Sequence, residues 1–276
     1  MKRNILIFIF LVSIKTPLIA QLMGGLMIPS KPLQFVLSGG IETSVGTETL
    51  LTFNNSGTLN ITGSGQARIL VVGAGGGGKS GKSNNGNIGG GGGRVIEQFL
   101  TLSPGTYNVT IGNGGTANGG NGGASNISGI TLTANGGLGN GTSGTGFIIG
   151  SALSGLWGAA ATCFTSSDGA GASGNGQAGV GAGPGIDNDI TGAIIQYGYG
   201  GGGGHYDGSL SYTCLQGNGA GYISYNNGNP PIPVNATPNA QNRGHGGNGG
   251  GNTSTLTAAS SAGSKGVIII RYTKLL

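Results

Sequence analysis

The chain has 276 residues, 66 of them glycine, a net charge of +5 and only 7% charged residues. Ordinary proteins contain about 7% glycine and about 25% charged residues. Because 36% of the residues are hydrophobic, the composition excludes the usual disordered chain, which has few apolar residues and a high net charge. The basic residues are scattered and form no stripe, so we do not expect the protein to bind nucleic acid.

Residues 1–20 have the pattern of a secretory signal peptide. Lys2 and Arg3 precede an apolar run at 5–14, and Ala20 is a small residue suited to the position before a cleavage site. The run is shorter than the roughly 20 residues that a transmembrane helix needs. We therefore expect a secreted or cell-surface protein. An uncleaved anchor and a buried N-terminal strand are the alternatives for this segment.

Residues 21–46 are predicted to be a lead or linker ahead of the folded domain. They contain Pro29 and Pro32 and show no helical period. Strand patterns begin after them. Residues 47–53 and 57–63 flank the sequence Asn-Asn-Ser, which is typical of a turn, so we expect these two segments to form a β-hairpin.

Five further segments have strand patterns: ARILVVG (67–73), RVIEQFLTL (94–102), YNVTIG (107–112), ISGITLTA (127–134) and GVIIIRY (266–272). The first and the last are continuous apolar runs, typical of strands buried on both faces. In the third, Tyr107, Val109 and Ile111 alternate with polar residues and should share one face. Glycine disfavours helix by about 1 kcal/mol per residue. We predict an all-β fold, an antiparallel β-sandwich-like domain over residues 47–272 with very little α-helix.

The intervals between these segments are rich in glycine and partly repetitive. NGGNGG at 118–123 and HGGNGG at 245–250 repeat every three residues, the period of a polyproline II helix. Ordering each residue costs about 1–2 kcal/mol of backbone entropy, so such a segment is rigid only within a packed array. We expect packed polyglycine helices, and flexible linkers are the alternative. Apolar residues between the tracts, such as Ile148 and Trp157, favour packing.

Three stretches carry a family resemblance: LLTFNNSGTLNITGSGQARILVVGAGGGG at 50–78, GGGGGRVIEQFLTLSPGTYNVTIGNGG at 89–115 and the closing GVIIIRY. In the order of these three stretches, the chain resembles the glycine-rich domain of bacterial surface proteins and phage tail proteins. The resemblance spans residues 47–272 and implies a β-domain with packed polyglycine insertions. Some relatives resemble the tip adhesins of phage tail fibres, in which loops between glycine tracts recognise a host surface. The apparent export signal favours a bacterial surface protein.

The stretch RILVVGAGGGGKSGKS at 68–83 matches the P-loop pattern twice and a dinucleotide-binding pattern once. A P-loop must open a helix whose amides hold the phosphates, but NNGNIGGGGG follows Ser83 instead. A magnesium-binding acid after a second apolar strand is also missing. The seven acidic residues are Glu42, Glu48, Glu97, Asp168, Asp187, Asp189 and Asp207. We predict that the protein binds no nucleotide and no other cofactor.

Metal and catalytic sites are not predicted either. His205 and His245 lie in glycine-rich surroundings and lack the i, i+4 partner of a helical zinc site. HYDG at 205–208 is better explained as a loop tip than as an ion site, and DND at 187–189 lacks the glycine and glutamate of an EF-hand. We expect a protein that is not an enzyme.

The best candidate for a binding site is a group of aromatic residues in loops at about 150–235. Loops rich in tyrosine, glycine, serine and asparagine make good recognition surfaces. The candidate residues are Trp157, Tyr197, Tyr199, His205, Tyr206, Tyr212, Tyr222 and Tyr225. A disulfide between Cys163 and Cys214 would brace this region in an exported chain, and two free buried thiols are the alternative. The alternative for the rings is that they fill the core or cap the glycine helices.

We therefore expect an adhesion protein whose loops bind a cell-surface glycan or an outer-surface protein. The main alternative is a structural or matrix component, including a phage tail-type one, in which the glycine array matters in itself. A third interpretation is an ice-binding face, but Thr131 and Thr133 are too few to carry it. A homo-oligomer is compatible with all three.

Overall fold

The computed structural model divides the chain into two compact units, Met1–Leu33 and Gln34–Leu276, and every described residue lies in the second. Described in full are residues 34–80, 89–139, 172, 183–202, 242–249 and 259–275. Several two-residue strands between these ranges are described by their backbone alone. The described residues contain no α-helix, and so none that is long and apolar enough to cross a membrane.

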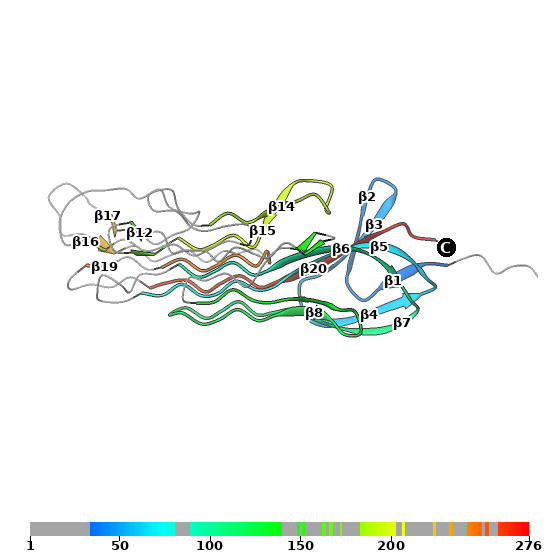
Figure 1. Ribbon diagram of the computed structural model, residues 1–276, viewed down its shortest axis with the longest axis horizontal. Helices are drawn as coiled ribbons and strands as arrows, with labels where there is room; N and C mark the ends of the chain where they lie inside the picture. Colours follow the sequence, from blue (N-terminus) through cyan, green and yellow to red (C-terminus); the bar gives the residue numbers. More distant parts are fainter. Residues whose placement is uncertain are drawn as a thin grey trace, which may run out of the picture. The chain divides into compact units, whose positions relative to one another are not determined.

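Two sheets make up most of the fold (Figure 1). The smaller has the strand order β1 (Val36–Ser38), β4 (Gly57–Thr62), β7 (Gly105–Thr110), β8 (Ser125–Ile127) and β9 (Leu132–Ala134). The larger has the order β11 (Ser151–Ala152), β10 (Ile148–Ile149), β6 (Val95–Leu102), β5 (Gly65–Val72), β20 (Val267–Tyr272), β3 (Glu48–Phe53) and β2 (Ile41–Val45). Neighbours in both sheets are antiparallel, except for the parallel pair β10–β6.

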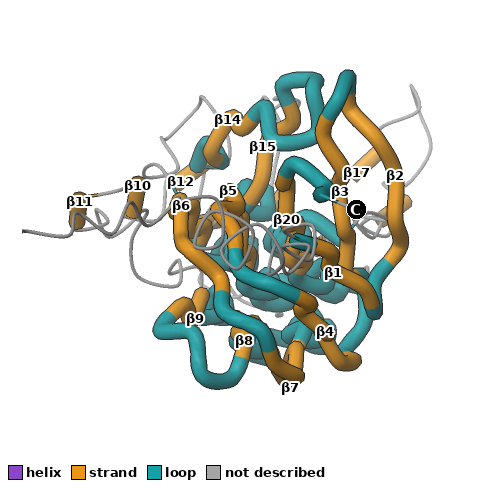
Figure 2. Tube along the Cα trace, turned by 90° about the vertical axis from the view of Figure 1, so that its right-hand side faces the viewer, coloured by secondary structure: helices purple, strands orange, loops and turns teal. Residues whose placement is uncertain are grey.

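Four further pairs are β12 (Thr162–Cys163) with β13 (Ser166–Ser167), β14 (Ile186–Asn188) with β15 (Ile195–Tyr197), β16 (Tyr206–Asp207) with β19 (Asn252–Thr253) and β17 (Ile223–Ser224) with β18 (Ile232–Pro233). The larger sheet lies between the smaller sheet and the β14–β15 hairpin (Figure 2). The predicted all-β fold is therefore confirmed.

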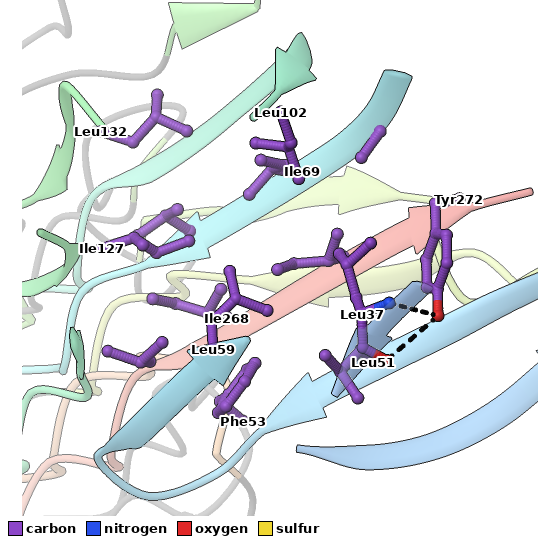
Figure 3. Close-up of a cluster of buried hydrophobic side chains, with 14 of the residues drawn as sticks. Leu37, Leu51, Phe53, Leu59, Ile69, Leu102, Ile127, Leu132, Ile268 and Tyr272 are labelled. Carbon is purple, nitrogen blue, oxygen red and sulfur yellow. Dashed lines mark hydrogen bonds between the residues drawn. The ribbon is translucent and has the colours of Figure 1, made fainter. Parts of the chain in front are cut away.

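A hydrophobic core fills the space between the two sheets (Figure 3). Leu37 and Leu59 from the smaller sheet meet Ile69 and Ile268 from the larger one, and all four are fully buried. The ring of Tyr272 packs against Phe35 edge to face, with centroids 5.4 Å apart. Its hydroxyl accepts a hydrogen bond from the Leu37 amide at 3.1 Å and donates one to the Leu37 carbonyl at 3.2 Å. Tyr272 thereby joins the two sheets.

A second core lies on the opposite face of the larger sheet, under the β14–β15 hairpin. Leu70, Val72 and Ile269 point away from the first core and pack with Ile190 and Tyr197. Strands β5 and β20 are thus covered on both faces, as their continuous apolar runs predicted. The predicted inward face of β7 is also confirmed, because Val109 and Ile111 are buried and Tyr107 packs partly buried against the first core.

The predicted hairpin of residues 47–63 is wrong. Its two segments form β3 and β4, but β3 pairs with β2 and β20 whereas β4 pairs with β1 and β7. Both strands bury alternate side chains in the same core, Phe53 from one and Ile61 from the other. They therefore face each other across the core, and residues 54–56 cross from one sheet to the other. The Ser56 hydroxyl fixes this crossing by accepting a hydrogen bond from the Ile111 amide at 3.0 Å.

Two other expectations change. The single strand expected at 127–134 is interrupted: a turn at 128–131 separates the end of β8 from β9, since Gly129 adopts φ +77°, a left-handed conformation that suits glycine. Residues 34–46, assigned to a lead, carry β1 and β2 and bury Phe35 and Leu37. The sandwich therefore begins before residue 47, with two buried apolar residues that alternate along the chain.

We predict that Tyr272→Phe lowers the free energy of unfolding by about 1–3 kcal/mol, because it leaves the buried Leu37 amide and carbonyl without their partner. Chemical denaturation followed by circular dichroism measures this loss. The control is Tyr107→Phe, whose hydroxyl donates to the Ser103 carbonyl at an exposed position and should change stability by less than about 0.5 kcal/mol. Equal effects of the two substitutions would contradict the role given to Tyr272.

Candidate functional site

Residues 73–78, here called the central segment, continue β5 into a set of packed glycine-rich segments. Their amides donate hydrogen bonds with a period of three to the carbonyls of Arg94 and Gly91 (from Gly73 and Gly76), Gly123 and Gly120 (from Ala74 and Gly77), and Ser264 and Ser261 (from Gly75 and Gly78). Residues three apart therefore bond to the same neighbour. This is the threefold repeat of a polyproline II-type helix, and it is the packed arrangement expected from the sequence.

The carbonyls of the central segment extend the contacts to three more segments. Ala74, Gly75 and Gly76 accept hydrogen bonds from the amides of Gly137, Gly115 and Gly247. The central segment is thus bonded to 89–94, 119–124 and 259–266 through its amides, and to 112–116, 135–139 and 242–249 through its carbonyls. Together with 198–202, which bonds to 89–94 and 242–249, these segments form what we call the glycine array. In Figure 1 they run side by side from the ends of the strands.

Glycine is required in the array because neighbouring backbones occupy the space of a side chain. A methyl group added at Gly75 would overlap the His245 carbonyl, and one at Gly78 would overlap the Asn248 carbonyl. All residues of the central segment are buried. Since its six amides already bond to carbonyls inside the array, they do not form the phosphate cradle of a P-loop. Lys79, the lysine of the first P-loop match, is exposed.

Polar side chains also accept hydrogen bonds from amides of the array. The hydroxyls of Ser261 and Ser264 accept hydrogen bonds from the amides of Asn248 and His245, at 2.8 and 2.7 Å. His245 Nδ1 accepts the Tyr199 amide at 3.1 Å. Burial, assisted by the nearby charge of Arg243, lowers the pKa of His245 to about 4. The imidazole is therefore neutral near pH 7, as an acceptor at Nδ1 requires.

Two of the predicted binding residues lie where the structure describes their side chains. Tyr197 is only 2% exposed in the second core, and burial raises the pKa of its phenol. Tyr199 is half-buried, and its ring packs edge-on against His245 with centroids 6.1 Å apart. Tyr197 therefore stabilises the core and does not belong to an exposed binding surface. Core filling was the alternative for these rings.

The remaining candidates lie outside the described side chains. Tyr206 is in β16 and Cys163 in β12, strands described by their backbone. The others are Trp157, His205, Tyr212, Cys214, Tyr222 and Tyr225. The disulfide between Cys163 and Cys214 stays a prediction. The described residues contain no group of three or more metal-ligating side chains.

The hydrogen bonds do fix where the chain enters and leaves the array. Gly78 bonds to Ser261, Ser261 to Asn248, and Gly249 to Gly202. These residues therefore lie together at the end of the array away from β5 and β20, which we call the far end. The described residues that flank 81–88 and 250–258, and the residue that precedes 203, therefore lie at this end of the array.

An ion-pair network that the sequence did not reveal lies on the outer face of the larger sheet. Arg68 of β5 forms ion pairs with Glu97 of β6 and, at 2.5 Å, with Asp189 after β14. The other Glu97 oxygen accepts a hydrogen bond from Asn188 Nδ2 at 2.6 Å. Glu97 and Asn188 are both buried, so breaking the network would leave an uncompensated charge. The network holds the β14–β15 hairpin on the sheet.

The close packing in the array predicts that Gly75→Ala lowers the free energy of unfolding by about 3 kcal/mol or more, since the added methyl overlaps backbone that cannot rotate away. Gly57→Ala is the matched control, because a methyl group there has no atom within 4 Å and should change stability by less than about 1 kcal/mol. Urea denaturation of both variants tests this. Similar stabilities would show that the array is not tightly packed.

The depressed pKa of His245 predicts an acid-dependent loss of stability. The unfolded chain binds the proton near pH 6.5, whereas the folded protein does so at about 4. Stability due to the neutral imidazole is therefore complete above pH 6.5 and falls, by about 3 kcal/mol at most, as the pH drops to 4. Urea denaturation of wild type and His245→Asn between pH 7 and pH 4 isolates this effect, since the carboxylates titrate in both. A variant with the same pH dependence as wild type would refute it.

Comparison with family models matches residues 52–273 to the glycine-rich domain family. A comparison with curated proteins found no match. The matched range holds both apolar central strands, the central segment and most of the sandwich. Because it covers most of the 276 residues, the chain belongs to the glycine-rich domain family.

Proposed function

We propose that this protein is exported and acts in surface recognition or adhesion, with the glycine array as a rigid support for the segments joined to it. The observation that carries the proposal is the period-three hydrogen bonding of residues 73–78 to six neighbouring segments. Rigid presentation of a binding segment lowers the entropy that binding must overcome. A chain that only linked two parts would not need this ordered backbone.

The segment that we assign to recognition is 203–241, which starts at the far end of the array. It contains Tyr206, Tyr212, Tyr222 and Tyr225 among glycine, asparagine and serine. This composition is the one that suits adaptable recognition surfaces. Its partner would be a cell-surface glycan or an outer-surface protein, recognised by stacking on the rings and by hydrogen bonds to asparagine amides.

The proposed location rests on sequence patterns. The signal-like residues 1–20 and the resemblance to bacterial surface proteins together support a secreted or surface-attached protein, without catalytic activity. The alternative is a structural component, including a phage tail-type one, whose array needs no specific ligand. The observation that favours this alternative is the regular hydrogen bonding of the glycine array, which a structural component could use without any ligand.

The test is the combined replacement of Tyr206, Tyr212, Tyr222 and Tyr225 by alanine, assayed on a glycan array and on intact bacterial cells. We expect binding to fall by about tenfold or more, because such rings are common binding hot spots. The thermal unfolding midpoint should stay near that of wild type, because none of the four is among the described residues of the two cores or of the glycine array.

The control is Ile41→Ala, an exposed apolar residue of β2, 58% accessible and outside both cores, which should bind as wild type does. Undiminished binding by the tyrosine variant would refute recognition by this segment. If wild-type protein binds neither the glycan array nor the bacterial cells but forms filaments in the electron microscope, the structural role would be established instead.

A further inference from the structure

A cleft of about 400 Å³ opens on the outer face of the larger sheet, beside the β14–β15 hairpin. Its walls come from four strands and the hairpin: Glu48, Gln66, Ala67, Arg68, Phe99, Asp189, Arg271, Tyr272 and Thr273. The cleft belongs to the sandwich and not to the far end of the array. None of the wall residues belongs to the aromatic segment assigned to recognition above, so the inference does not rest on that proposal.

One wall of the cleft is an exposed aromatic ring. Phe99 is 75% accessible and lies directly opposite Arg68 in the β5–β6 register. The Arg68 guanidinium is 6.0 Å from the ring centroid. A single exposed apolar residue is common on protein surfaces and needs no explanation by itself. Phe99 is informative because most of the other wall residues of the same cleft are polar or charged.

The polar walls are held in place before any ligand arrives. Arg68 is tied to Glu97 and Asp189, and Arg271 is tied to Glu48 at 2.5 Å. The side chains of Asp189 and Glu48 are nevertheless 64% and 37% exposed. An ionised carboxylate offers about four acceptor positions, so each can accept further hydrogen bonds from a ligand. Arg68 lowers the pKa of Asp189 and thereby keeps it ionised.

The charges define the kind of ligand. Two guanidinium groups, from Arg68 and Arg271, face three carboxylates, from Glu48, Glu97 and Asp189. An anion would gain no net attraction from this set, and a cation, whether a metal ion or an ammonium group, would meet two arginines already bound to the carboxylates. A neutral ligand suits the site best if it has one apolar face for the ring and hydroxyl groups for the carboxylates.

We propose that this cleft binds a neutral pyranose sugar. The apolar C–H face of the sugar packs on the Phe99 ring, whose face carries partial negative charge. Hydroxyl groups of the sugar donate hydrogen bonds to Asp189 and Glu48, and the Gln66 amide contributes a donor and an acceptor at the rim. The cleft is thus a shallow single-sugar site of modest affinity, built on rigid strands.

Saturation-transfer NMR on the whole chain tests the proposal with five probes. The neutral ones are the methyl glycosides of glucose, galactose and mannose, and the charged ones are glucosamine and N-acetylneuraminic acid. We expect transfer to at least one neutral sugar at millimolar concentration, strongest on the protons of one ring face, and weaker transfer to both charged sugars. The same experiment on the variant lacking Tyr206, Tyr212, Tyr222 and Tyr225 should give the same result, which separates this site from the proposed recognition segment.

Substitutions at Phe99 locate the binding. Phe99→Ala should weaken binding roughly fivefold, as loss of one aromatic contact predicts, whereas Phe99→Trp should retain it. The matched control is Ile194→Ala. Ile194 is 77% exposed on the β14–β15 hairpin but is not a wall residue of the cleft, so this variant should bind as wild type does. Phe99→Leu keeps an apolar side chain without a ring and should bind as weakly as Phe99→Ala even if alanine disturbs the fold.

Three results would overturn the proposal. They are the absence of transfer to all neutral probes, equal binding by wild type and Phe99→Leu, and a preference for either charged sugar.

Discussion

The need to satisfy backbone hydrogen bonds without side chains governs the glycine-rich part of this protein. In a sheet, a strand bonds to two neighbours and its faces are covered by side chains. In the central segment, successive amides and carbonyls point in different directions, so six neighbouring backbones are needed to satisfy them. Each neighbour must approach closely, and the overlap that a Cβ at Gly75 or Gly78 would cause shows why these positions are glycine. The composition therefore follows from the hydrogen-bonding geometry.

The sandwich buries apolar side chains and is stabilised by them, whereas the glycine segments have few such side chains to stabilise their ordered conformation. Segments of the array continue strands directly: 73–78 follows β5, 89–94 precedes β6, and 259–266 precedes β20. Packing of Ile69 and Ile268 in the first core fixes the register of these strands. The same register then determines which amide meets which carbonyl in the array. Ordering each glycine costs about 1–2 kcal/mol of backbone entropy. Because the strands hold one end of each of these segments in a fixed register, fewer alternative pairings of the segments are open to the chain.

Sequence patterns predicted those features that depend on neighbouring residues. The unbroken apolar runs of β5 and β20 predicted central strands, and the period of three in the glycine tracts favoured packed helices over flexible linkers. The turn signal between β3 and β4 did not predict their pairing correctly, because a turn within one sheet and a crossing between two sheets use the same residues. The Arg68–Glu97–Asp189 network depends on the β5–β6 register and on a residue 121 positions away, so no local pattern could locate it. Tyrosine-rich composition likewise could not distinguish buried Tyr197 from an exposed ring.

Acidic side chains lie in the sandwich and the hairpin, and none lies in the described segments of the array. The described acidic residues, Glu42, Glu48, Glu97, Asp187 and Asp189, all lie in the two sheets or the hairpin. A carboxylate inside the array would need partners where most neighbours are backbone groups already bonded to other backbone groups. The buried Glu97 has such partners in Arg68 and Asn188, and through them it fixes β14 on the sheet. Since β15 continues into 198–202, whose Gly201 amide donates to the Gly90 carbonyl, this ion pair also sets where one outer segment joins the array. The polar network and the glycine packing are therefore parts of one arrangement, and a ligand that altered the network at the cleft would act on both.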